Sequence, residues 1–115
     1  MAINKKPITE QMRIKAISVY RFLQANKNRY CTKEEISNFM GGLNERTIRD
    51  IINWLRNKHV MVISTSSGKG YKLADLENKT DIEEVKHMLY ELESRKLEIE
   101  SVQKCCDKFL KQAKA

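Results

Sequence analysis

The sequence predicts an α+β, mostly helical fold, in which three helices and a small antiparallel hairpin precede a long C-terminal helix. Two observations support this prediction. Between residues 32 and 73, helix start signals, a pair of glycines and two short β-branched or aromatic segments follow one another. From residue 82 onward, apolar residues recur at intervals of three and four. The 115 residues are enough for one small domain and an appendage.

A first helix is expected from about Thr9 to Asn26, where apolar residues recur at helical spacing. Its buried stripe is expected to comprise Met12, Ala16, Val19, Tyr20 and Leu23. Residues 1–8 contain Pro7 and are expected to form a flexible arm. Residues 29–31 follow a polar turn and are expected to form a short strand that pairs with the hairpin.

The second helix begins with a capping box. The Thr32 hydroxyl can accept from the Glu35 amide, while the Glu35 carboxylate accepts from the Thr32 amide. Apolar residues then recur at helical spacing up to Gly41 and Gly42, which can end the helix because glycine adopts the left-handed conformation of a C-cap.

The third helix is expected from Glu45 to about Lys58, with Asn44 as its N-cap. At about 100° per residue it divides into two faces. The apolar stripe comprises Ile48, Ile51, Ile52 and Leu55. The opposite face comprises Arg46, Asp50, Asn53 and Asn57, with Arg49 and Arg56 on one flank and Thr47 and Trp54 on the other. Arg can bond guanine bidentately and Asn can bond adenine, so this face suits a major-groove reader. The alternative is an ordinary solvated polar face.

A hairpin is expected next, with strands at Val60–Ser64 and Tyr71–Leu73. Val62 and either Tyr71 or Leu73 can lie on its core side. The tip between the strands contains Ser66, Ser67 and Lys69, and Lys69 lies between two glycines from which it can reach phosphate or the minor groove.

Residues 74–79 form a polar connector, and a second capping box of Thr80 and Glu83 is expected to start a helix over 80–114. This helix carries a three-four repeat whose polar exceptions are Lys96 and Gln103. The repeat comprises Ile82, Val85, Leu89, Leu92, Lys96, Ile99, Gln103, Cys106, Leu110 and Ala113.

Two interpretations of this amphipathic helix remain open. It can form a homodimeric coiled coil, parallel or antiparallel, or it can fold back onto its own domain. The expected dimerisation residues are Ile82, Val85, Leu89, Leu92, Ile99, Cys106 and Leu110. At about 1.5 Å per residue the helix extends about 50 Å, more than a small domain can cover.

The net charge of +7 is distributed unevenly. Residues 1–72 hold 14 Lys and Arg against 5 acidic residues, whereas residues 73–115 hold 8 against 10. A basic surplus confined to the first three helices and the hairpin is typical of a polyanion-binding domain.

The sequence also indicates a compartment and excludes several kinds of site. No stretch approaches the ~18 consecutive apolar residues of a membrane span, and the N-terminus lacks the apolar core of a signal peptide. Three cysteines agree with a reducing, cytoplasmic location. The adjacent Cys105 and Cys106 lack metal-ligand spacing, and His59 and His87 are isolated. We therefore expect no metal site, no cofactor and no membrane partner.

One family resemblance is present. Residues 42–56 (GLNERTIRDIINWLR), then Val60, then residues 68–73 (GKGYKL) resemble the winged helix-turn-helix domain of biotin operon repressors. The resemblance covers about residues 9–73 and implies a winged-helix fold that binds DNA through the helix beginning at Asn44 and the wing at Lys69. It does not imply biotin chemistry, because the larger ligase part of that family, with its glycine- and arginine-rich loop, is not in this sequence.

The leading hypothesis is a dimeric, sequence-specific transcriptional regulator that binds double-stranded DNA. Its expected DNA contacts are Lys33, Asn44, Arg46, Thr47, Arg49, Asp50, Asn53, Ser67 and Lys69. Asp50 has three possible roles: it can accept from a cytosine amino group, orient Arg46 as an i,i+4 pair, or repel phosphate. A phage or plasmid replication or maintenance protein and a protein-interaction module are the alternatives. No catalytic constellation is evident, so an enzyme is not expected, and no small-molecule effector can be inferred.

Overall fold

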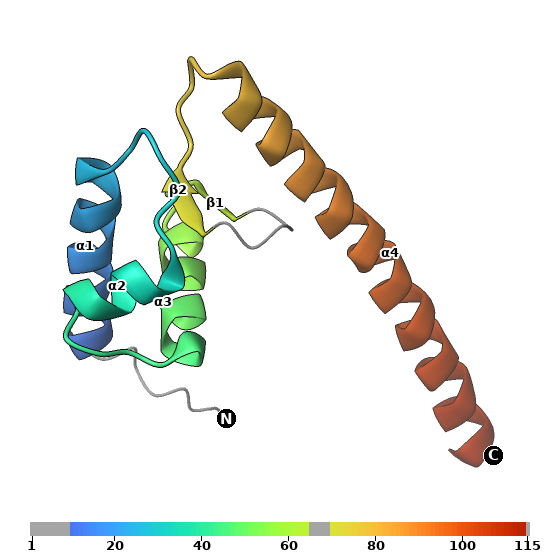
Figure 1. The fold of residues 1–115 in the computed structure, drawn as a ribbon. Coiled ribbons are helices and arrows are strands. Elements are labelled where there is room, and N and C mark those ends of the chain that lie inside the picture. The colour runs from blue at the N-terminus through green and yellow to red at the C-terminus, as the bar shows by residue number, and fades with distance from the viewer. Residues whose placement is uncertain (1–9, 65–69, 115) are drawn as a thin grey trace.

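The computed structural model describes residues 10–64 and 70–114, and within them the fold is mostly helical with one antiparallel hairpin. The elements in order are α1 (Glu10–Ala25), α2 (Lys33–Phe39), α3 (Glu45–Asn57), β1 (Val62–Ser64), β2 (Tyr71–Leu73) and α4 (Lys79–Lys114). Figure 1 shows α1, α2, α3 and the hairpin gathered into one body, from which α4 extends. The α+β class, the hairpin and the long last helix are confirmed, while the expected arm at residues 1–8 lies outside the described residues.

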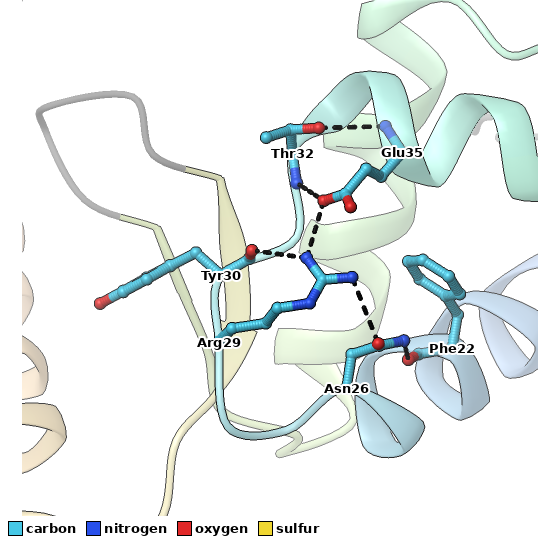
Figure 2. Close-up of polar contacts among 6 residues, drawn as sticks. All are labelled: Phe22, Asn26, Arg29, Tyr30, Thr32 and Glu35. Carbon is cyan, nitrogen blue, oxygen red and sulfur yellow. Dashed lines mark hydrogen bonds and ion pairs between the residues drawn. The ribbon is translucent and has the colours of Figure 1, made fainter.

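The junction between α1 and α2 is held by the predicted capping box and by one arginine. Thr32 Oγ1 accepts from the Glu35 amide at 3.1 Å, and Glu35 Oε1 accepts from the Thr32 amide at 2.9 Å. Figure 2 shows Arg29 donating to the same carboxylate at 2.9 Å and to Asn26 Oδ1 at 3.2 Å. Asn26 donates in turn to the Phe22 carbonyl at the end of α1. Side chains of the turn and of α2 therefore form one connected network that is anchored to the Phe22 carbonyl of α1.

The core lies between α1 and α3. Ala16, Val19 and Leu23 of α1 are fully buried. The apolar stripe of α3 that the sequence predicted is buried against them, with Ile48, Ile51, Ile52 and Leu55 at most 3% exposed. Met12 and Tyr20, expected in the α1 stripe, pack at its margin and are only partly buried. Helical spacing thus identified the buried faces, because both helices cover a single core.

The hairpin is extended on one side by the segment before α2. Val62 pairs with Leu73 and Ser64 with Tyr71. Cys31 bridges Tyr71 through both backbone groups, at 2.7 and 2.8 Å, so the strand expected at residues 29–31 is present as a single bridge. Strand β1 begins at Val62, two residues later than expected. The hairpin tip, residues 65–69, lies outside the described residues.

The position of Gly70, next to this bridge, has room for glycine and for no larger residue. Its φ is +121°, a region that L side chains rarely adopt, and a Cβ there would overlap the Cys31 carbonyl group. Gly41 and Gly42 also have positive φ angles, as expected for residues that end α2.

The other face of the hairpin is covered by the start of α4. Ile63 and Lys72 are register partners and so share this face, and both are buried. Lys72 Nζ lies 2.7 Å from Asp81 Oδ1, and Asp81 Oδ2 accepts from the Asp75 amide at 3.0 Å. Asp81 is only 1% exposed. A buried ion pair therefore fixes α4 to the hairpin.

The predicted start of α4 was wrong by one residue. The helix begins at Lys79, and Asn78 Oδ1 accepts from the Asp81 amide at 3.0 Å. Thr80 is inside the first turn, so the expected capping box of Thr80 and Glu83 is not formed. With Asn78 as the cap, Asp81 lies in the first turn over the hairpin, where it binds Lys72.

Beyond its first three turns, α4 leaves the body. All its residues from Leu89 to Ala113 are exposed, and Figure 1 shows the helix running away from α3 towards its C-terminal end. The helix therefore folds back onto its own domain only in its first turns. None of the helices in the described parts of the chain has the length and apolarity that a membrane crossing requires.

Candidate nucleic-acid interface

The candidate interface is built on α3, which two polar side chains hold in place at its N-terminal end. Asn44 caps the helix as predicted, with its side-chain oxygen accepting from the Thr47 amide at 2.8 Å. Ser37 of α2 bonds both backbone groups of Leu43, donating at 3.0 Å and accepting at 2.9 Å. The turn between α2 and α3 is therefore fixed by a serine whose role no sequence signal indicated.

The polar face of α3 points away from the core. Arg46, Arg49, Asp50 and Asn53 are exposed, and Thr47 is partly buried beside them. Within the described residues, neither Arg46 nor Arg49 has a hydrogen bond or ion pair. The Arg46–Asp50 pair that the sequence allowed is thus not formed. Two guanidinium groups are left facing solvent on one helix, available to a ligand.

Lys33, by contrast, has a partner. Its Nζ lies 3.1 Å from Glu45 Oε2, joining the first turns of α2 and α3. The hydrogen bond raises the pKa of Lys33 and lowers that of Glu45. Both side chains are about half exposed, so water screens this pair. A phosphate can reach Lys33 only in competition with Glu45.

Arg56 supports the site rather than belonging to it. Sequence periodicity placed it on a flank of the polar face, but its Nε and Nη2 both donate to the Val62 carbonyl, at 2.9 and 2.8 Å. Nη2 also bonds Ser64 Oγ at 3.2 Å. Burial lowers the pKa of this guanidinium. Arg56 therefore sets the position of β1 against α3 and is not free to contact DNA.

The C-terminal half of the polar face lies opposite α4. An open cavity of about 750 Å³ has Asn53, His59 and Met61 on one side and Met88, Leu92 and Arg95 of α4 on the other. Asn53 is exposed, but it faces this cavity. The face is therefore divided into a first half with Arg46, Arg49 and Asp50, and a second half that shares its space with α4.

The expected dimerisation residues lie along α4, and all but one are exposed. Val85 is partly buried against the body. The exposed fractions rise from 38% at Ile82 to 57% at Ile99 and at Leu110. Leu89, Leu92 and Cys106 are exposed as well. Of the twelve large apolar side chains exposed in the described residues, nine belong to α4.

Two expected DNA contacts, Ser67 and Lys69, lie outside the described residues.

The chain matches no protein-family model, no curated protein and no solved structure.

Proposed function

We propose that this chain is a small DNA-binding protein in which residues 9–73 form a winged helix that reads the major groove with α3, and that it acts as a dimeric, sequence-specific transcriptional regulator. The observation that supports this most is the pair of unpartnered guanidinium groups, Arg46 and Arg49, on the exposed face of α3. The same helix is fixed from behind by four fully buried apolar residues, so the two arginines project from a rigid support.

The position of these arginines suits base reading. A helix that enters the major groove contacts base edges mainly with its N-terminal residues. Arg46 and Arg49 lie in the first two turns of α3. A guanidinium binds the O6 and N7 atoms of guanine bidentately, which contributes about 1–3 kcal/mol of discrimination. Asp50, one turn after Arg46 on the same face, can accept from a cytosine amino group.

The charge distribution supports the same proposal. Residues 1–72 carry an excess of nine positive charges, which favours association with the phosphate backbone irrespective of base sequence. Lys33 is suited to a phosphate contact once Glu45 is displaced, and Lys69 of the sequence-predicted wing is a second candidate. Phosphate contacts position the protein and base contacts select the site.

A homodimer through α4 completes the proposal. The exposed apolar side chains on this helix have no cover within the described residues, and such a surface marks an interaction site. Two bodies joined by α4 can place two reading helices on two half-sites of one duplex.

The experiment is selection of DNA from a random duplex library, followed by fluorescence anisotropy titration of the enriched duplex at several salt concentrations. A consensus with two-fold symmetry and a steep salt dependence is expected. Arg46→Ala and Arg49→Ala should each weaken binding to the consensus by about tenfold or more, with a smaller effect on random DNA.

The matched control is Arg21→Ala, which removes the same charge from an exposed position on α1. It should weaken consensus and random DNA equally and slightly. Equal losses from all three variants would contradict reading by α3. Binding without any consensus would favour a replication or maintenance role, and no binding even at low salt would leave the protein-interaction alternative.

A further inference from the structure

The exposed apolar stripe of α4 lies on the same face that contacts the body. In the first three turns, Asp81, Val85 and Met88 face the body, where Asp81 is buried and the other two are partly buried. At about 100° per residue, five apolar residues farther along fall within the same sector of about 80°. These residues are Leu92, Ile99, Cys106, Leu110 and Ala113.

The intramolecular interface therefore continues as an uncovered surface. In the first turns this face packs on the hairpin, and from Leu92 onward the same face is exposed because α4 extends past the body. Ile82 and Leu89, which the sequence placed in the seam, lie outside the sector, about 60° and 40° from its edge. Leu97 is 67% exposed but lies almost opposite it.

We propose that the uncovered face binds the same face of a second copy in antiparallel orientation, from Leu92 to Ala113. The inference rests on the proposed dimer and adds its orientation. Helices that pack together lie 8–10 Å apart. In a parallel, in-register pair, the first turns would have to face each other across that distance, but each protomer's own body occupies that side of its helix.

Antiparallel pairing removes this conflict. The two bodies then lie at opposite ends of the pair, and only the uncovered halves of the helices touch. Leu92 of one protomer lies near the last turn of its partner, Ile99 faces the Val102 to Cys106 region, and the centre falls near residue 102. The end of the partner helix then lies close to Leu92, one of the residues that line the cavity shared with Met61 and Met88.

The first experiment measures distances between nitroxide labels in the protein without DNA. Cys105→Ser and Cys106→Ala remove the exposed cysteines, while Cys31 is buried and does not react. A label at Glu83→Cys and, in a separate variant, one at Ser101→Cys then report on each pair. Antiparallel pairing places the two residues 83 about 60 Å apart and the two residues 101 about 20–25 Å apart, at ~1.5 Å of rise per residue and a helix diameter of ~10–12 Å. Short distances at both positions would show parallel pairing, and no intermolecular distance would show a monomer; either result overturns the inference.

A second experiment tests the face. Ile99→Glu places a charge in the seam and should raise the dimer dissociation constant at least about tenfold by sedimentation equilibrium. Leu97→Glu makes the same change two residues away on the opposite face and should leave it unchanged. Equal effects of the two would contradict the assigned face. Neither experiment contains DNA, so a failure of the proposed DNA binding leaves the orientation testable, and a parallel dimer leaves the reading helix untouched.

Discussion

The buried ion pair between Lys72 and Asp81 offers the sharpest test of how α4 is attached. Lys72 Nζ and Asp81 Oδ1 are 2.7 Å apart, and their side chains are 10% and 1% exposed. The second carboxylate oxygen binds the Asp75 amide. Lys72 also lies 5.6 Å from the centre of the Tyr30 ring. Removing either charge leaves the other in a site with little access to water.

The expected magnitude differs between the two single variants. Leaving one member of a buried pair uncompensated costs roughly 3–5 kcal/mol of unfolding free energy. Asp81→Ala should fall near the lower value, about 3 kcal/mol, because the long Lys72 side chain can move its ammonium group towards water. Lys72→Met should lose nearer the upper value, about 4 kcal/mol of unfolding free energy. The reason is that the short Asp81 side chain cannot move its carboxylate to water.

Urea unfolding at fixed protein concentration, followed by Trp54 fluorescence, measures these values. The double variant Lys72→Met/Asp81→Ala should lose less than the two single variants together, with a coupling energy of about 2–3 kcal/mol. The matched control is the exposed pair of Lys86 and Glu83 on the same helix, 3.5 Å apart. Its cycle should give no more than about 0.5 kcal/mol.

A coupling energy for Lys72 and Asp81 as small as that of the control pair would refute the reasoning. It would mean that water reaches the pair and that the ion pair does not fix α4 to the hairpin. Hydrogen exchange gives an independent measurement, since the Asp75 amide should lose protection in Asp81→Ala while amides in α1 keep theirs.

Two further predictions concern the body. Arg56→Met should lower the unfolding free energy by about 2 kcal/mol in urea titrations, because the Val62 carbonyl loses two charged donors; a loss below about 0.5 kcal/mol would mean that water replaces the guanidinium. The pKa of Glu35 is lowered chiefly by the hydrogen bond from Arg29 and also by the Thr32 amide, so its contribution to stability is present above the unfolded value of about 4.3 and is lost as the pH falls through the folded value. Glu35→Gln should therefore flatten the loss of urea stability as the pH falls below about 4.3. An Arg29→Met variant should flatten the same loss, because it removes the main hydrogen bond to this carboxylate, and an unchanged pH profile in both variants would contradict the role of Arg29.

Local signals in the sequence were sufficient for the elements of the body. The capping box at Thr32 and the cap at Asn44 each depend on residues three positions apart, so they are visible in the sequence. The buried face of α3 follows from spacing alone. The start of α4 was not predicted correctly, because the helix is capped by Asn78 and not by Thr80. Asp81 in its first turn also binds Lys72, nine residues away, and local signals do not reveal such a tertiary contact.

The same limit applies to the candidate interface. Periodicity placed Arg46, Arg49 and Arg56 on the outer side of α3, but it gives an angle and not a partner. Arg56 turned out to bind the Val62 carbonyl, and Lys33 turned out to bind Glu45 on the next helix. Only the tertiary contacts separate side chains that are occupied within the body from side chains that remain available to a ligand.

The availability of only two unpartnered arginines on α3 has a consequence for the proposed function. If each reads one guanine, a single body gains about 2–6 kcal/mol of discrimination, whereas specific sites are usually preferred over random DNA by about 4–10 kcal/mol. Asn53 adds little to this discrimination, because it faces α4 across the cavity. A single body is thus a weak reader, and two bodies on two half-sites reach the usual range. The proposed DNA reading therefore depends on the α4 dimer, so Ile99→Glu should reduce selection of the consensus even though this residue touches no base.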